Sequence, residues 1–136
     1  MLQSDFTQQR VFIVGDGSLF DEGITHLLAY ETDLLVSHAT YSKDLAFLNM
    51  IKSDQPDVIL VSETGSLDSA HIIDSVLSYP IVIGLCIVVV RLYNNVIDVY
   101  EGPTFAAGKA SRKPRRIIAR TGDDLLNTVR RKYDDQ

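Results

Sequence analysis

Short apolar runs alternate along the chain with stretches in which apolar residues recur every three or four positions. The first run, Arg10–Val14 (RVFIV), is rich in β-branched and aromatic residues and ends at the turn signal GDGS of 15–18, which predicts a buried strand. Ser18, followed three residues later by Asp21, resembles a helix capping box. The apolar positions that then follow at helical spacing are Phe20, Ile24, Leu27 and Leu28. The opening therefore predicts a strand, a tight loop and a helix.

The same alternation continues through most of the chain. Pro56 and Pro80 mark unit boundaries, because proline ends helices and rarely lies within a central strand. Further expected elements are a strand at 34–39, a helix from about Ser42, a strand at 57–61, a helix through 72–77, a strand within 81–90 and a helix through 92–100 that ends near Gly102.

The last third of the chain has weaker periodicity. Residues 103–116 (PTFAAGKASRKPRR) contain two prolines and a dense basic run, which predicts a loop or a frayed strand. A short strand at 117–119 follows. Thr121 then caps a final helix, with Asp123 and Asp124 in its first turn.

Strand and helix thus alternate about five times, and each parallel strand pair needs a crossover connection. We therefore expect one α/β domain over 1–136, with a doubly wound, five-stranded parallel sheet and helices on both faces. Ligand and catalytic groups in such sheets collect at the carboxyl ends of the strands.

Composition and charge add constraints on location and partners. The polar start of the chain does not predict a secretion signal, and the apolar run 81–90 is well short of the roughly 20 residues of a membrane helix. The single cysteine, Cys86, suits a reducing compartment, so a cytoplasmic location without membrane contact is expected. The first 108 residues hold four basic and fourteen acidic residues, a charge of −10, whereas the remainder carries +5. Acidic partners would meet the carboxy-terminal third.

The candidate site positions carry a resemblance to a known family. Leu19, Phe20 and Gly23 match a helix that begins Leu-Phe-x-x-Gly, and Pro56–Glu63 (PDVILVSE) matches a strand that normally ends in an aspartate. From Arg10 to about Gly102 the chain resembles the receiver domains of bacterial response regulators, particularly the family that carries a LuxR-type helix-turn-helix. In that family the aspartate accepts a phosphoryl group, and an acidic pair after the first strand holds Mg²⁺.

The resemblance implies a flavodoxin-like fold and a degenerate receiver. The acidic pair corresponds to Gly15 and Asp16, and the acceptor position is Ser62, whose hydroxyl is a poor nucleophile without an adjacent base. Neither acyl phosphate formation nor tight Mg²⁺ binding is expected, and no other cofactor is indicated. Glu63 follows Ser62, but neighbouring side chains on a strand point to opposite faces, so it is no simple replacement.

The family's switch positions are also altered. Its fourth strand ends in a Ser or Thr, for which this chain offers Cys86 and its apolar neighbours. The lysine that follows its fifth strand corresponds to Arg120, with Lys109 as the alternative. If Arg120 is the match, 103–116 is a basic loop or insertion.

Each of these residues has a plainer structural interpretation. Asp16 is favoured as a turn aspartate over a cation site, Ser62 as a hydrogen-bonded strand end over a kinase target, and Cys86 as core over a reactive thiol. His26, His38 and His71 lack metal-ligand spacing and are expected to be surface or satisfied polar residues.

The basic run favours a solvated or partner-docking loop over direct nucleic-acid contact, because Phe105 is its only aromatic residue. Its charged residues are Lys109, Arg112, Lys113, Arg115 and Arg116.

The leading hypothesis is a regulatory domain, not an enzyme, that signals by protein contact without aspartyl phosphorylation. The resemblance implies a homodimer through the family's fourth and fifth helices and the strand between them, with a sensor kinase or other regulator as a further partner. The chain would be either a stand-alone domain or, as we favour, the amino-terminal part of a longer regulator, and DNA would be bound only through a domain that follows Gln136. The alternative is a small α/β enzyme or a phosphate- or nucleotide-binding protein that uses the 15–18 loop.

Overall fold

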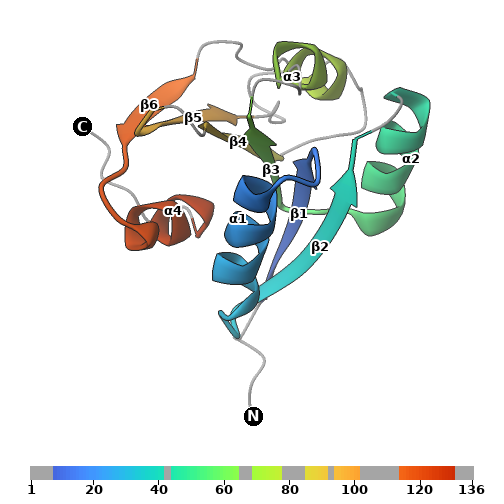
Figure 1. The fold of residues 1–136 in the computed structure, drawn as a ribbon. Helices are drawn as coiled ribbons and strands as arrows, with labels where there is room; N and C mark the ends of the chain where they lie inside the picture. Colours follow the sequence, from blue (N-terminus) through green and yellow to red (C-terminus); the bar gives the residue numbers. More distant parts are fainter. Residues whose placement is uncertain are drawn as a thin grey trace.

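The computed structural model describes residues 8–41, 44–64, 69–77, 85–91, 94–101 and 114–130. They form one six-stranded sheet with helices on both faces (Figure 1). The elements in chain order are β1 (Gln9–Gly15), α1 (Leu19–Ala29), β2 (Leu34–Thr40), α2 (Asp44–Asp54), β3 (Val58–Glu63), α3 (Ser69–Leu77), β4 (Cys86–Arg91), β5 (Val96–Glu101), β6 (Arg115–Ile118) and α4 (Gly122–Val129).

The strand order is β2-β1-β3-β4-β5-β6. β1 pairs in parallel with β2 and with β3, and β3 pairs in parallel with β4. β5 is antiparallel to β4, and β6 is antiparallel to β5. The predicted α/β class is therefore confirmed, but the sheet is mixed and six-stranded instead of parallel and five-stranded.

The predicted helix at 92–100 is wrong, because β5 occupies Val96–Glu101. Ile97 and Val99 are buried among the residues of α1 and α4, whereas Asp98 and Tyr100 lie on the opposite face of the sheet. This is the alternation of a strand. In so short a segment the apolar residues also fit helical spacing, and the β-branched residues decide for a strand. Asn94 supports the preceding turn by accepting from the Val96 N–H at 3.0 Å.

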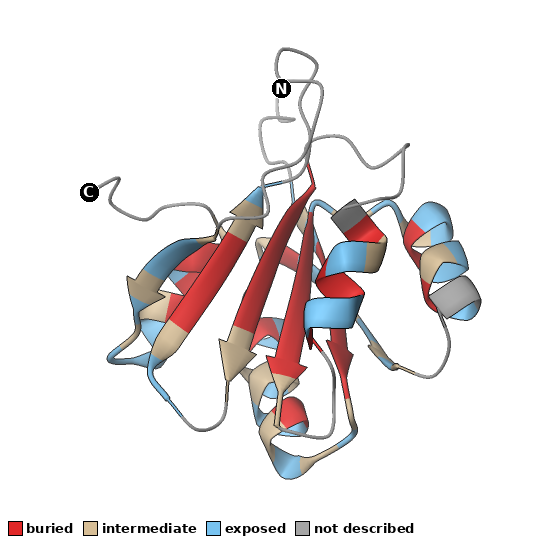
Figure 2. Ribbon diagram, turned by 90° about the horizontal axis from the view of Figure 1, so that it is seen from above, coloured by how far each residue is buried: buried red, intermediate tan, exposed pale blue. Residues whose placement is uncertain are grey.

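Two apolar layers hold the sheet between its helices. One face packs against α1 and α4, with Leu28 and Val129 fully buried, and the other packs against α2 and α3. Phe12 of β1 stacks on Phe47 of α2 with ring centroids 6.2 Å apart. Figure 2 shows burial concentrated in the central strands and falling off at the sheet edges. None of the helices in the described ranges is long and apolar enough to cross a membrane.

Arg130 ties the end of α4 to the turn between α1 and β2. Its guanidinium donates to Glu31 at 2.5 Å and to Asp33 at 2.8 and 3.0 Å. These hydrogen bonds, first to Asp33 and then to Glu31, raise the pKa of Arg130 above its ordinary value. The pair of helices on this face is thereby fixed to the edge of the sheet that carries β2.

Candidate functional site

The carboxyl ends of β1, β2 and β3 meet around the carboxylate of Asp21, which is fully buried. Ser62 at the end of β3 donates its hydroxyl to Asp21 Oδ1 at 2.8 Å. Nε2 of His38, a residue of β2, lies 2.7 Å from Asp21 Oδ2. The Gly17 N–H donates to the same oxygen at 3.1 Å. We call Gly15, Gly17, Asp21, His38 and Ser62 the Asp21 site.

The start of α1 directs Asp21 inward. Ser18 is the N-cap, and its hydroxyl accepts from the Asp21 N–H at 3.3 Å. The predicted capping box is therefore half correct, because the Asp21 carboxylate bonds Gly17, His38 and Ser62 rather than the Ser18 N–H. The first turn of a helix favours a negative charge, which contributes to the stability of this buried group.

Gly15 leaves the space that the Asp21 carboxylate fills. A Cβ at residue 15 would lie 2.1 Å from Asp21 Cγ and from Oδ1, a separation that real structures do not tolerate. This is one of the two positions where the resembling family carries an acidic pair. The carboxylate beside Ser62 comes instead from Asp21, on the helix.

Asp16 completes the loop between β1 and α1. It accepts from the Ser18 N–H at 3.0 Å and from the Thr64 hydroxyl. The first contact is the turn geometry expected of this residue from the sequence. Gly17 has φ +81°, a left-handed conformation that favours glycine. The amides of Gly17 and Ser18 both point to carboxylates of the chain itself.

A second polar cluster lies on the opposite face of the sheet, where Glu63 points. Glu63 accepts from the Ser69 hydroxyl at 2.5 Å and pairs with Arg91 at 3.3 Å. Arg91 also donates to Asp98 at 2.7 Å, and Asp98 is 1% exposed. Arg116 of β6 donates to both oxygens of Asp98 at 2.8 and 3.3 Å.

We call this cluster, Glu63, Ser69, Arg91, Asp98 and Arg116, the Asp98 network. Burial raises the pKa of the Asp98 carboxyl, but hydrogen bonds from Arg116 and Arg91 outweigh burial and hold that pKa below its ordinary value. Burial, together with the charge of Asp98, raises the pKa of Tyr100. The network joins β3, β4, β5 and β6 through side chains as well as through the backbone.

The structure separates two of the predicted switch residues from Ser62. The expected place of Cys86 is wrong: it begins β4 and pairs with Val58 at the amino ends, whereas Ser62 pairs with Val90. Arg120 follows β6, which runs parallel to β3. Because β4 and β5 both lie between them, β6 is three strand spacings from β3, about 14 Å. Arg120 is therefore too far from Ser62 for direct contact.

The basic positions are only partly described. Arg115 and Arg116 are in β6, at the end of the segment predicted as a basic loop or insertion. Lys109, Arg112 and Lys113 lie outside the described residues. Over the described ranges, no three His, Cys, Asp or Glu side chains are grouped to hold a metal ion.

Sequence reasoning missed three residues that the structure brings into these clusters. His38 follows Ser37 in an edge strand and has no metal-ligand spacing, so nothing local connects it with Asp21. At Asp21 the sequence pattern indicates only a helix capping box. Asp98 carried a usable signal, because an acidic residue between Ile97 and Val99 is unusual in an apolar segment and indicates a buried partner.

Comparison of the chain with protein-family models, with curated proteins and with solved structures gives no match.

Proposed function

We propose that the chain is a receiver-like regulatory domain that acts through protein contact and does not accept a phosphoryl group on aspartate. The order β2-β1-β3-β4 of its parallel strands supports this proposal, because it is the order of the flavodoxin-like, doubly wound sheet. In this proposal β6 and α4 correspond to the last strand and helix of a receiver. β5 replaces the helix that would otherwise follow β4.

The observation that carries the proposal is the state of Ser62. Its hydroxyl is fully buried and donates to Asp21, so the acceptor position offers neither a carboxylate nor an accessible oxygen. Asp21 is no substitute, since its carboxylate is buried as well. Phosphoryl transfer requires the attacking oxygen to approach the phosphorus in line with the leaving group.

The alternative, a phosphate held by the 15–18 loop, is less well supported. A phosphate at a helix amino terminus needs backbone N–H groups that are available to it. Here the Gly17 N–H donates to Asp21 and the Ser18 N–H donates to Asp16. The two carboxylates take the positions of phosphate oxygens and would repel an added anion.

The proposed contact surface differs from that of the resembling family, because β5 follows β4 in the chain where that family has its fourth helix. It comprises the outer side of β6 and the start of α4, where Ile118 is 64% exposed and the Arg116 side chain 65% exposed. We propose that a second copy of the chain contacts this surface. Any DNA contact would belong to a further domain.

Incubation with acetyl phosphate and Mg²⁺, followed by intact-protein mass measurement, tests the loss of phosphotransfer. We expect no phosphate adduct, while an ordinary receiver with its acidic residues intact is modified in the same mixture. A wild-type adduct that hydroxylamine removes would be an acyl phosphate and would contradict the proposal.

Sedimentation equilibrium over a range of concentrations tests the contact surface. We expect self-association of the wild type that Ile118→Glu abolishes and that Lys52→Gln, an exposed change in α2 outside this surface, leaves intact. A monomer at every concentration would exclude the second copy as the partner.

A further inference from the structure

β2 is the end strand of the sheet and presents one side of its backbone outward. The Tyr41 N–H donates to the Gly15 carbonyl, and the Asp33 carbonyl accepts from the Gln9 N–H. The backbone N–H and C=O groups of the odd-numbered residues in 33–41 therefore point toward β1, because these groups point to opposite sides in successive residues. The N–H and C=O groups of the even-numbered residues Val36, His38 and Thr40 point to the outer edge. No strand in the described ranges pairs with that edge.

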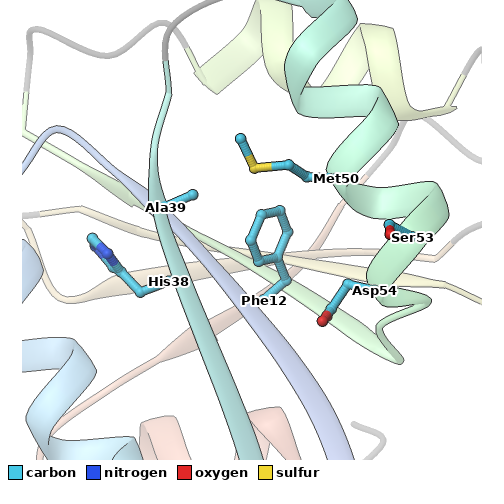
Figure 3. A pocket seen from close by; sticks show the side chains of 6 residues that line it. All are labelled: Phe12, His38, Ala39, Met50, Ser53 and Asp54. Carbon is cyan, nitrogen blue, oxygen red and sulfur yellow. The ribbon is translucent and has the colours of Figure 1, made fainter.

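A pocket of about 290 Å³ adjoins this edge, between β2 and α2. Within the described ranges it is lined by Phe12, His38, Ala39, Met50, Ser53 and Asp54. In Figure 3 the side chains of Ala39, Met50 and Phe12 point toward one another, and the His38 ring points away from them. The volume is just below that of small-molecule sites, which run from about 300 Å³ upward, and suits a single long side chain.

The pocket combines apolar walls with one carboxylate. Asp54 Oδ1 accepts from the Ser37 hydroxyl at 3.3 Å. Arg10 donates to the backbone carbonyl of Asp54 at 3.1 Å, not to its carboxylate. Within the described part of the chain, the Asp54 carboxylate has no ion pair. A negative charge beside apolar carbon surface matches lysine and arginine, whose apolar stems lie on such surfaces while the charged ends bind carboxylates.

We propose that the outer edge of β2 binds an extended segment of a partner protein, whose lysine or arginine side chain enters the pocket and pairs with Asp54. The peptide backbone adds a strand beside Val36, His38 and Thr40, and the pocket selects the side chain, as in other cases of strand addition. The proposal rests on the function proposed above only in that it names a partner for protein contact. It concerns the sheet edge opposite to β6.

Fluorescence anisotropy with labelled peptides tests the charge requirement. The probe is a short peptide of alternating valine and threonine around one central lysine, compared with peptides that carry norleucine or glutamate at the centre. We expect the norleucine peptide to bind about tenfold more weakly, because its stem remains but its charge is lost. The glutamate peptide should bind more weakly still.

Protein variants identify the carboxylate. Asp54→Asn keeps the shape and the acceptor for Ser37, and it should lower the affinity for the lysine peptide to that of the norleucine peptide. Asp123→Asn removes the same charge from an exposed position in α4 and should leave binding unchanged. Equal losses in both variants would indicate a general charge effect and would overturn the proposal.

Amide hydrogen exchange tests the strand addition itself. Bound lysine peptide should slow exchange at Val36, His38 and Thr40, and methylation of the peptide nitrogens that face β2 should abolish this protection. Protection at β6 instead would overturn the proposal. The proposal would also be overturned if butylamine bound as tightly as the lysine peptide without protecting β2. Self-association of the wild type that Asp54→Asn prevents would overturn it as well. None of these outcomes bears on phosphorylation, which the mass measurement above tests separately.

Discussion

Asp21 and Asp98 are both buried carboxylates at the sheet, but they lie on opposite faces and are balanced in different ways. Asp21 is held by a hydroxyl, a backbone amide and one histidine, within the start of a helix. Asp98 is held by two arginines from neighbouring strands. We therefore expect steric fit against Gly15 to be the main constraint on the Asp21 site, and electrostatic attraction to be the main constraint on the Asp98 network.

The largest expected effect comes from disturbing the steric fit between Gly15 and Asp21. Gly15→Ala should lower the free energy of unfolding by about 3 kcal/mol, because the new methyl group overlaps the Asp21 carboxylate. Asp21→Ala should also destabilise, since Ser62 and Gly17 lose their acceptor. In the double variant the methyl group enters vacated space, so the two losses should not add, with an interaction of about 2 kcal/mol. Urea unfolding measures all four proteins, and strict additivity would refute the steric account.

The next largest effect is expected from removing the negative charge of Asp98. Asp98→Asn should lower the free energy of unfolding by about 2 kcal/mol, because Arg91 and Arg116 keep their charges and lose their shared partner. Arg116→Gln is the control. Since the Arg116 side chain is 65% exposed, its loss should lower the free energy of unfolding by less than the loss of Asp98 does. A larger cost for Arg116→Gln than for Asp98→Asn would contradict the central place of Asp98.

The pH dependence of stability should separate the same variants. The pKa of Asp98 is lower in the folded protein than its ordinary value, so its contribution is complete above about pH 4 and is lost as the pH falls through the folded pKa. Urea unfolding at a series of pH values should show the wild type losing stability below about pH 4 more steeply than Asp98→Asn. Asp123→Asn should follow the wild type. Parallel curves for wild type and Asp98→Asn would contradict the lowered pKa.

Ser62→Ala should have the smallest effect, about 1 kcal/mol, because it removes one hydrogen bond and leaves Asp21 with two other donors. Urea unfolding at neutral pH gives the value. A cost above that of Gly15→Ala would place hydrogen bonding, not fit, at the centre of the Asp21 site.

The sequence predicted the first half of the fold well and the second half poorly, for a physical reason. The units before Pro80 pair an apolar strand with a longer helix, and the two periods are distinct. Residues 92–101 are too few to distinguish them, so the antiparallel β5 was missed. This one error also misplaced the surroundings of Arg120, because an inserted strand moves everything beyond it by one strand spacing.

The residues of the candidate site also divide into those that the sequence predicts and those that it does not. Gly15, Asp16 and Ser62 were found because the ends of parallel strands are known once the strands are known. Asp21 and His38 were not connected with Ser62, since their meeting depends on the direction of a helix side chain and on the pairing of β2 with β1. Such contacts between distant segments leave no local signal in a single sequence.

The antiparallel connection from β4 to β5 also has a consequence for folding kinetics. Only four residues, 92–95, separate these strands, so their ends meet at a small entropic cost, whereas β1 and β3 must close a loop that contains a strand and two helices. Local pairs form faster than distant ones. We therefore expect β4 and β5 to pair early during refolding and to provide the edge on which β3, and later β1 and β2, assemble.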